Sequence, residues 1–103
     1  MIETFVALAE PNRLRIIELL RDGPRPVGEI GDQLRLRQPQ TSKHLRVLKK
    51  AGLVDVHPDA QRRVYQLRAH RLRELDTWLE PYRQYWSERL DALENMLRGE
   101  SEE

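Results

Sequence analysis

The stretch from Gln38 to Leu53 holds the side chains in this sequence that are best suited to contacting a polyanion. Thr41, Leu45 and Leu48 recur at positions i, i+4 and i+7, which predicts one helix with an apolar stripe. A neighbouring face carries amide, ammonium and imidazole groups at helical spacing, on Gln40, Lys43 and His44 together with Val47. Such groups suit the base edges and phosphates of a DNA major groove, whereas an ordinary solvated helix face is the alternative for this stretch alone.

The ends of this helix carry their own signals. Pro39 falls in the first turn, where its missing N–H breaks no helical hydrogen bond. Lys49 and Lys50 fall in the last turn, where positive charge suits the helix dipole. Gly52 is predicted to end the helix, since glycine adopts the left-handed conformation without strain.

Composition limits the class of protein. The 103 residues are enough for one domain, but the hydrophobic fraction of 39% is below the usual ~45–50%. We therefore expect a helical domain that buries part of its apolar surface against a second copy of itself. The absence of cysteine excludes disulfides and thiolate chemistry and is compatible with a cytoplasmic location. No apolar run approaches the ~20 residues that span a bilayer, so no membrane partner is expected.

The small net charge of +1 conceals an asymmetry along the chain. Residues 1–70 carry 13 basic and 8 acidic side chains, a net of +5, and residues 71–103 carry 5 and 9, a net of −4. Within residues 35–68 the counts are 9 and 2, a net of +7. This distribution predicts a polyanionic partner for the middle of the chain.

Three helices are predicted before residue 38. Residues 1–9 form a short amphipathic helix, Pro11 opens a second with an apolar stripe from Leu14 to Leu20, and a third carries Val27, Ile30 and Leu34. Gly28 and Gly31 in the third helix either permit close packing against the next helix or reflect neutral sequence drift. A short turn with a buried Leu36 joins this helix to the next, which makes a helix-turn-helix.

After Gly52 the hydrophobic period changes to two, with Val54 and Val56 before a loop at 58–60 and Tyr65 and Leu67 after it. This pattern predicts a β-hairpin. A hairpin directly after a recognition helix is a wing, so the predicted fold is mainly α, a winged helix-turn-helix. Two arginines near the tip, Arg62 and Arg63, are placed to reach phosphates or the minor groove, with a solvated pair as the alternative.

Residues 70–98 are predicted to form a long helix with a heptad-like apolar seam, kinked or split near Pro81. Residues 1–98 would form the single domain, and 99–103 a frayed acidic tail. The aromatic cluster on this helix is more often core or interface than a ligand site. An unidentified small-molecule effector would bind in a pocket lined by Trp78, Tyr82 and Trp86.

The sequence resembles the ArsR family of bacterial winged-helix repressors along nearly its whole length. The resemblance rests on Ala7–Ile17, Gln38–Leu45 and Leu48–Val54. It implies a homodimer on an inverted-repeat operator, with the first and last helices forming the dimer. The predicted DNA-binding residues are Arg37, Gln38, Gln40, Thr41, Ser42, Lys43, His44, Arg46, Arg62 and Arg63. The predicted dimerisation residues are Ile2, Phe5, Val6, Trp78, Tyr82, Tyr85, Trp86, Leu90, Leu93 and Leu97.

The sequence departs from the family pattern in three places. Arg37 replaces the serine usual before Gln-Pro, which removes a helix N-cap typically worth ~1 kcal/mol and places an arginine near a phosphate. The wing lacks a glycine, so a looser turn is expected. The family's Cys-x-Cys motif is absent and the histidines are scattered, at His44, His57 and His70, so neither a metal nor a cofactor is expected.

These observations favour a dimeric transcriptional repressor that binds double-stranded DNA. The alternative is a winged-helix module that binds protein and not DNA, although such an interface does not require the basic middle segment. An enzyme is not expected, because no nucleophile has a paired base. Ser42 and His44 are close in sequence, but positions i and i+2 of a helix do not face each other.

Overall fold

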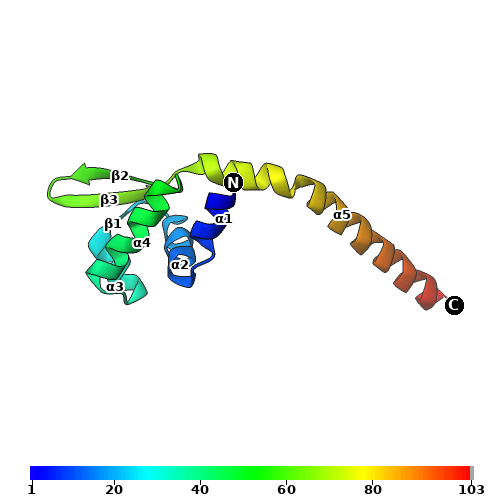
Figure 1. The fold of residues 1–103 in the computed structure, drawn as a ribbon. Coiled ribbons are helices and arrows are strands. Elements are labelled where there is room, and N and C mark those ends of the chain that lie inside the picture. The colour runs from blue at the N-terminus through cyan, green and yellow to red at the C-terminus, as the bar shows by residue number, and fades with distance from the viewer. Residues whose placement is uncertain (103) are drawn as a thin grey trace. The chain divides into compact units, whose positions relative to one another are not determined.

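The computed structural model describes residues 1–102, with residues 100–102 described by their backbone alone. The chain forms two compact units, Met1–Arg73 and Glu74–Glu103. Figure 1 shows the elements in order: α1 (Ile2–Leu8), α2 (Pro11–Leu20), β1 (Arg25–Pro26), α3 (Val27–Leu34), α4 (Gln38–Lys50), β2 (Val54–Asp59), β3 (Arg62–Leu67) and α5 (Ala69–Glu102). The first unit holds everything up to the start of α5, and its winged helix-turn-helix fold confirms the predicted fold class.

Helix α2 begins as the sequence predicts. Pro11 occupies the first turn, and the Glu10 carboxylate accepts a hydrogen bond from the backbone N–H of Arg13 at 2.8 Å. The apolar stripe is narrower than predicted, because Ile17 is buried while Leu14 is 42% exposed. Leu14 therefore lies outside the face that packs on the core.

Helices α3 and α4 approach each other closely at one glycine. A Cβ atom on Gly31 would lie 3.1 Å from Oγ1 of Thr41 and 3.2 Å from the carbonyl oxygen of Leu36. The close-packing explanation therefore holds for Gly31, whereas a Cβ on Gly28 would meet nothing within 4 Å. The turn between the helices begins at Arg35, whose φ of 57° is left-handed, and contains a half-buried Leu36.

The sheet has three antiparallel strands in the order β1-β3-β2. β1 was not predicted, because two residues are too few to show an alternating pattern. Its proline is compatible with a strand at the edge of a sheet. The predicted loop at 58–60 is also wrong: Pro58 and Asp59 continue β2 and pair with β3. The hairpin turns instead at residues 60–61, where Ala60 adopts a φ of 56°. The turn is thus short despite lacking glycine, and the expected looser turn is not found.

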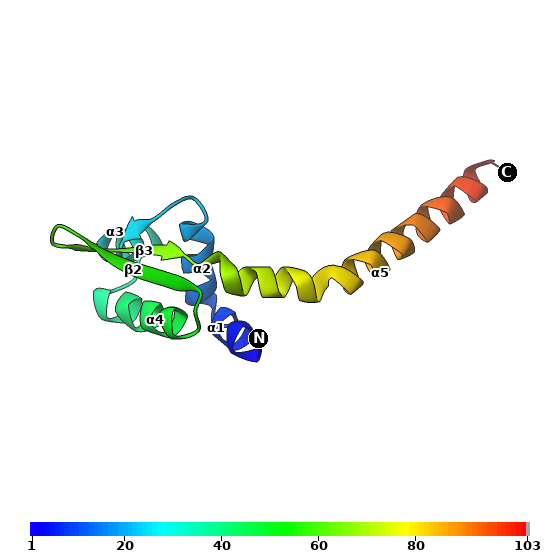
Figure 2. The ribbon, with the colours of Figure 1, turned by 90° about the horizontal axis from the view of Figure 1, so that it is seen from above.

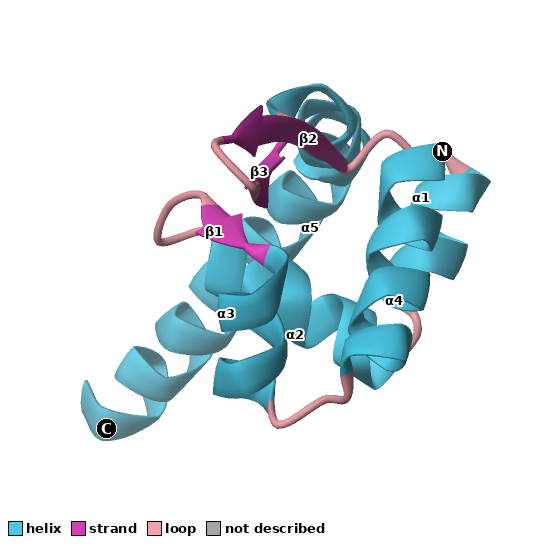
Figure 3. Ribbon diagram, turned by 90° about the vertical axis from the view of Figure 1, so that its left-hand side faces the viewer, coloured by secondary structure: helices cyan, strands magenta, loops and turns pink. Residues whose placement is uncertain are grey.

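The core of the first unit lies where α2, α3 and α4 meet beneath the sheet (Figure 3). Its fully buried aliphatic side chains come from each of these elements and from the start of the wing: Ile16, Ile30, Leu45, Leu48, Leu53 and Val54. Figure 2 shows the β2–β3 hairpin extending beside α4. The core thus fixes which side of α4 turns inward, and with it which side is free.

Helix α5 runs unbroken through Pro81, so the predicted alternative of a split helix is wrong. A proline removes one backbone hydrogen bond and displaces the carbonyl groups of the preceding turn. Arg83 links the turns on either side of Pro81, since its guanidinium donates to the carbonyl oxygen of Asp76 at 2.8 Å and to the carboxylates of Asp76 and Glu80, each at 2.6 Å. The hydrogen bond to Asp76 raises the pKa of Arg83, followed by that to Glu80.

The C-terminal end of α5 coincides with the predicted acidic tail. The helix includes residues 99–102, so its backbone is helical where fraying was expected, and residue 103 lies outside the described residues. The expectation of a single domain over residues 1–98 stays a prediction. None of the helices in the described part of the chain combines the length and apolar character needed to cross a membrane.

Candidate nucleic-acid interface

The outward side of α4 is set by the residues that it buries. Thr41, Leu45 and Leu48 are each 0% exposed and anchor one side of the helix. Because successive residues turn by about 100°, the opposite side presents Lys43, Arg46 and Lys50. We call these three side chains the outer face of α4. All three are exposed, and none has an ion pair or hydrogen bond to another described side chain.

This outer face is rotated from the one predicted, which combined Gln40, Lys43, His44 and Val47. Lys43 keeps its outward position. Gln40 is exposed, but its side-chain oxygen accepts a hydrogen bond from the backbone N–H of Arg37 at 3.3 Å. That bond partly replaces the missing N-cap, since the guanidinium of Arg37 has no acceptor atom. Arg46 was already among the predicted DNA-binding residues, and phasing the helix from its buried residues would have added Lys50 from the sequence.

Thr41 is the one predicted DNA-binding residue that the core fully encloses. Its hydroxyl donates to the carbonyl oxygen of Arg37 at 3.0 Å, and its side chain lies against Gly31. The predicted contact of Thr41 with DNA is therefore wrong. Its place in the apolar stripe, predicted from the same spacing, is confirmed.

His44 lies at the side of α4 that faces the start of α2. Its side chain is 16% exposed, and its Nδ1 atom is buried, 3.7 Å from Oε2 of Glu10. The backbone N–H of Arg13 lowers the pKa of Glu10, and the neighbouring His44 acts in the same direction. Arg13 also donates to the carbonyl oxygens of Ala7 and Val6 at 2.6 and 3.2 Å. His44 is therefore directed mainly toward this cluster between α1, α2 and α4, and not toward the outer face.

The two arginines of the wing differ in their surroundings. Arg62 donates to the carboxylate of Asp59 at 2.8 Å, so much of its charge is matched within the hairpin. Arg63 has no such partner among the described side chains, and it borders a hollow of about 250 Å³ between α4 and β3. We call this the α4–wing hollow; it is lined by Val27, Gln38, Ser42, Arg46, Lys49, Arg63 and Tyr65. Lys49 was not predicted to contact DNA.

Comparison with known proteins places this geometry in a family. A model described as a helix-turn-helix domain matches residues 8–57. The chain is 38% identical over 97 residues to the HTH-type transcriptional regulator Rv2034 of Mycobacterium tuberculosis, covering 94% of this chain and 88% of that one. It is 30% identical to the transcriptional repressor SdpR of Bacillus subtilis, covering 77% and 88%. A crystal structure of the ArsR family transcriptional regulator RHA00566 superposes with a TM-score of 0.71 at 25% identity, covering 82% of this chain and 88% of that one.

The chain belongs to the ArsR family of winged helix-turn-helix transcriptional regulators. The homodimeric winged helix-turn-helix DNA-binding domain of Mb0332 from Mycobacterium bovis is also similar, with a TM-score of 0.66 at 27% identity, covering 80% of this chain and 76% of that one. Family membership confirms the resemblance on which the sequence prediction relied.

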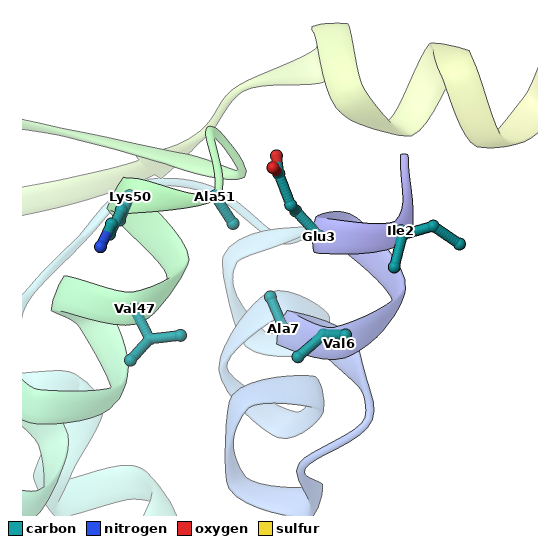
Figure 4. Close-up of a pocket in the computed structure, with 7 residues that line it drawn as sticks. All are labelled: Ile2, Glu3, Val6, Ala7, Val47, Lys50 and Ala51. Atoms are coloured by element: carbon teal, nitrogen blue, oxygen red, sulfur yellow. The ribbon is translucent and has the colours of Figure 1, made fainter.

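The ArsR-family chain exposes large apolar side chains on α1, where dimerisation was predicted. Ile2 is 73% exposed, Val6 62% and Phe5 37%. Beside them a hollow of about 360 Å³ separates α1 from the C-terminal half of α4 (Figure 4). Figure 4 shows Val47 and Ala7 lining it, with Lys50 directed away.

In the second unit, α5 carries the other predicted dimerisation residues. Trp78, Tyr82, Tyr85, Trp86, Leu90, Leu93 and Leu97 are between 42% and 64% exposed. The rings of Trp78 and Tyr82 lie 4.9 Å apart, and the guanidinium of Arg89 lies 4.9 Å from the ring of Tyr85. The seam therefore leaves a large apolar surface exposed in the second unit. Within the described residues, no group of three or more potential metal ligands comes together.

Proposed function

We propose that this chain is a transcriptional repressor that binds DNA as a homodimer on an inverted-repeat operator. The observation that carries the proposal is the outer face of α4, where Lys43, Arg46 and Lys50 stand free on a helix without any acidic residue. The related SdpR of Bacillus subtilis and SmtB of Mycobacterium tuberculosis are named repressors, which supports repression over activation.

The outer face of α4 and the wing would both contact the DNA. Lysine and arginine side chains that neutralise phosphates release counterions and give salt-dependent affinity without sequence preference. Arg46 and Lys43 are suited to hydrogen bonding with O6 and N7 of guanine, and each good contact contributes about 1–3 kcal/mol of discrimination. Gln38 and Ser42, which flank them on α4, supply further donors and acceptors.

The dimer would be built from the exposed apolar residues of α1 and α5. Mb0332, a similar structure, is a homodimer, and both helices here expose large apolar side chains. A twofold axis would set two copies of α4 one DNA turn apart, roughly 34 Å. We place the protein in the cytoplasm with its DNA, and we retain an unidentified small-molecule effector near Trp78, Tyr82 and Trp86 as part of the proposal.

The experiment begins with selection of bound duplexes from a random pool. Fluorescence anisotropy then compares the selected duplex with a scrambled duplex of equal length across a salt series. We expect the selected site to contain an inverted repeat and the affinity to fall steeply with salt for both duplexes. Absence of binding at every salt concentration would refute the proposal and favour a protein-binding module.

A further inference from the structure

His44 is a titratable side chain on α4 that the proposed contacts with bases and phosphates leave unused. Its side chain is 16% exposed, and its Nδ1 atom is buried. That atom has no hydrogen-bond partner among the residues that the structure describes. An unsatisfied buried polar atom is costly and uncommon in folded proteins, so its surroundings should explain it.

The group that explains this atom is the carboxylate of Glu10. Its Oε2 atom lies 3.7 Å from Nδ1 of His44, which is too long for a hydrogen bond but within the range of an ion pair. The same oxygen accepts a hydrogen bond from the backbone N–H of Arg13 at 2.8 Å and so caps the first turn of α2. That hydrogen bond lowers the pKa of Glu10, which keeps the carboxylate ionised near neutral pH.

The other groups near this pair are cationic or neutral. Arg13, in the first turn of α2, donates its guanidinium to the carbonyl oxygens of Ala7 at 2.6 Å and Val6 at 3.2 Å, so its charge is directed toward α1. The residues one turn away from His44 on α4 are uncharged: Gln40, Thr41, Val47 and Leu48. Glu10 is therefore the carboxylate with which a protonated His44 would pair.

We propose that His44 positions the recognition helix through Glu10, in a contact that closes when the imidazole takes up a proton, so that operator binding is stronger at mildly acidic pH. This inference rests on the proposed function and deepens it. Histidine is the side chain whose charge ordinarily changes between about pH 5 and 8. The imidazolium form donates from both ring nitrogens, so Nδ1 gains the partner that it otherwise lacks.

The contact between Glu10 and His44 joins the helix that meets DNA to a fixed part of the core. α2 is anchored by Ile16 and Leu20, which are 0% and 3% exposed, and Glu10 is its N-terminal cap. His44 directly follows Lys43 of the outer face, so the way in which His44 is held affects where Lys43 points. Closing the contact before DNA binds lowers the cost of ordering α4, which raises affinity without a new contact to DNA.

The test measures the operator affinity of the full chain by fluorescence anisotropy at constant ionic strength, between about pH 8 and about pH 5.5. A partly exposed ion pair changes an equilibrium constant about two- to fivefold, and the dimer has two such contacts. We therefore expect the wild type to bind about four- to twenty-five-fold more tightly at the lower pH. In His44→Gln, whose side chain takes up no proton, the affinity should be the same at both ends of this range.

Glu10→Gln separates positioning from a direct contact of the imidazolium with DNA. This variant keeps His44 and an acceptor for the cap of α2, but it loses the negative charge. If His44 acts through Glu10, the pH dependence should disappear in the variant. A pH dependence as large as that of the wild type would mean that the proton acts on DNA directly, and it would overturn the inference.

His57→Gln is the matched control, because His57 is an exposed histidine of β2 that lies outside the proposed DNA-binding residues. It should keep the wild-type pH dependence, and its loss there would move the titrating group to the wing and overturn the inference. Circular dichroism at each pH verifies that every protein is folded. Wild-type affinity that is equal or weaker at the lower pH would overturn the inference and leave the proposed function standing. Absence of binding to any duplex at any pH would overturn both.

Discussion

Substitution of the two glycines of α3 by alanine should have opposite effects on stability. Gly28 and Gly31 lie in the same helix, and each replacement gains helix propensity of about 1 kcal/mol at most. At Gly28 the new methyl group meets nothing within 4 Å, so Gly28→Ala should stabilise the fold by about 0.5–1 kcal/mol. The same methyl group at Gly31 would lie 3.1 Å from Oγ1 of Thr41 and 3.2 Å from the carbonyl oxygen of Leu36.

Neither neighbour of Gly31 is free to retreat. Thr41 is held by its hydrogen bond to the carbonyl oxygen of Arg37 at 3.0 Å, and the backbone of Leu36 is held by its N–H donating to Gly31 at 2.9 Å. Overpacking of a closed site costs about 1–3 kcal/mol, which outweighs the propensity gain. We therefore expect Gly31→Ala to destabilise the fold by about 1–2 kcal/mol.

The two variants are compared by thermal and urea unfolding at one protein concentration, because dimerisation makes the midpoint concentration-dependent. A separation of about 2 kcal/mol corresponds to a difference in Tm on the order of 10 °C for a domain of this size. The m-values should agree, which shows that the substitution changes stability and not the unfolded state. Equal stabilisation by both alanines would refute the close approach of α3 and α4 at Gly31.

Three further predictions follow from the contacts of single side chains. Glu10→Gln keeps an acceptor for the N-terminal cap of α2 but removes a carboxylate whose pKa is lowered in the folded state. The wild type should therefore be more stable than the variant at neutral pH, and this difference should vanish as the pH falls below about 4.3. Acid titrations of both proteins, followed by circular dichroism, measure the difference. Arg63→Gln should lower the salt slope of DNA binding by about 0.9 for each half-site of the dimer. Arg62→Gln, which loses a side chain already paired with Asp59, should change the slope little, and equal changes would contradict the assignment. Trp86→Ala should weaken the dimer about thirty-fold in sedimentation equilibrium, as loss of an interface aromatic does, and an unchanged dimer would exclude α5 from the interface.

The sequence predicted the helices of the first unit and the hairpin because their signals are local. Pro11 and Pro39 fix helix starts, Gly52 fixes an end, and the change of period after it marks the wing. β1 carries no local signal: its two residues become a strand only because the folded chain brings them beside β3. Pro58 likewise argues for a loop until pairing with β3 is known, since an edge strand tolerates it.

The helix of the candidate site was predicted, but the side of it that the structure leaves outermost differs from the predicted face. Residues 38–50 were assigned as one recognition helix, yet the face was chosen by the polarity of its side chains. The polarity of a side chain does not tell whether it faces protein or solvent. The Thr41 hydroxyl hydrogen-bonds to the backbone and His44 lies near Glu10, whereas Lys43 and Arg46 are exposed. Pairing within the hairpin is similarly invisible from sequence, so Arg62 and Arg63 seemed equivalent.

A contact between the outer face of α4 and DNA is central to the proposed function. It is tested most directly by the operator affinity of Lys43→Ala with Arg46→Ala, beside the charge-matched control Arg21→Ala with Arg73→Ala, at one salt concentration with dimerisation verified for each. We predict that the α4 variant loses its preference for the selected site over a scrambled duplex, about 2–6 kcal/mol for the two contacts of each half-site, while the control keeps it. An α4 variant that discriminates between the two duplexes as well as the control does would contradict the account.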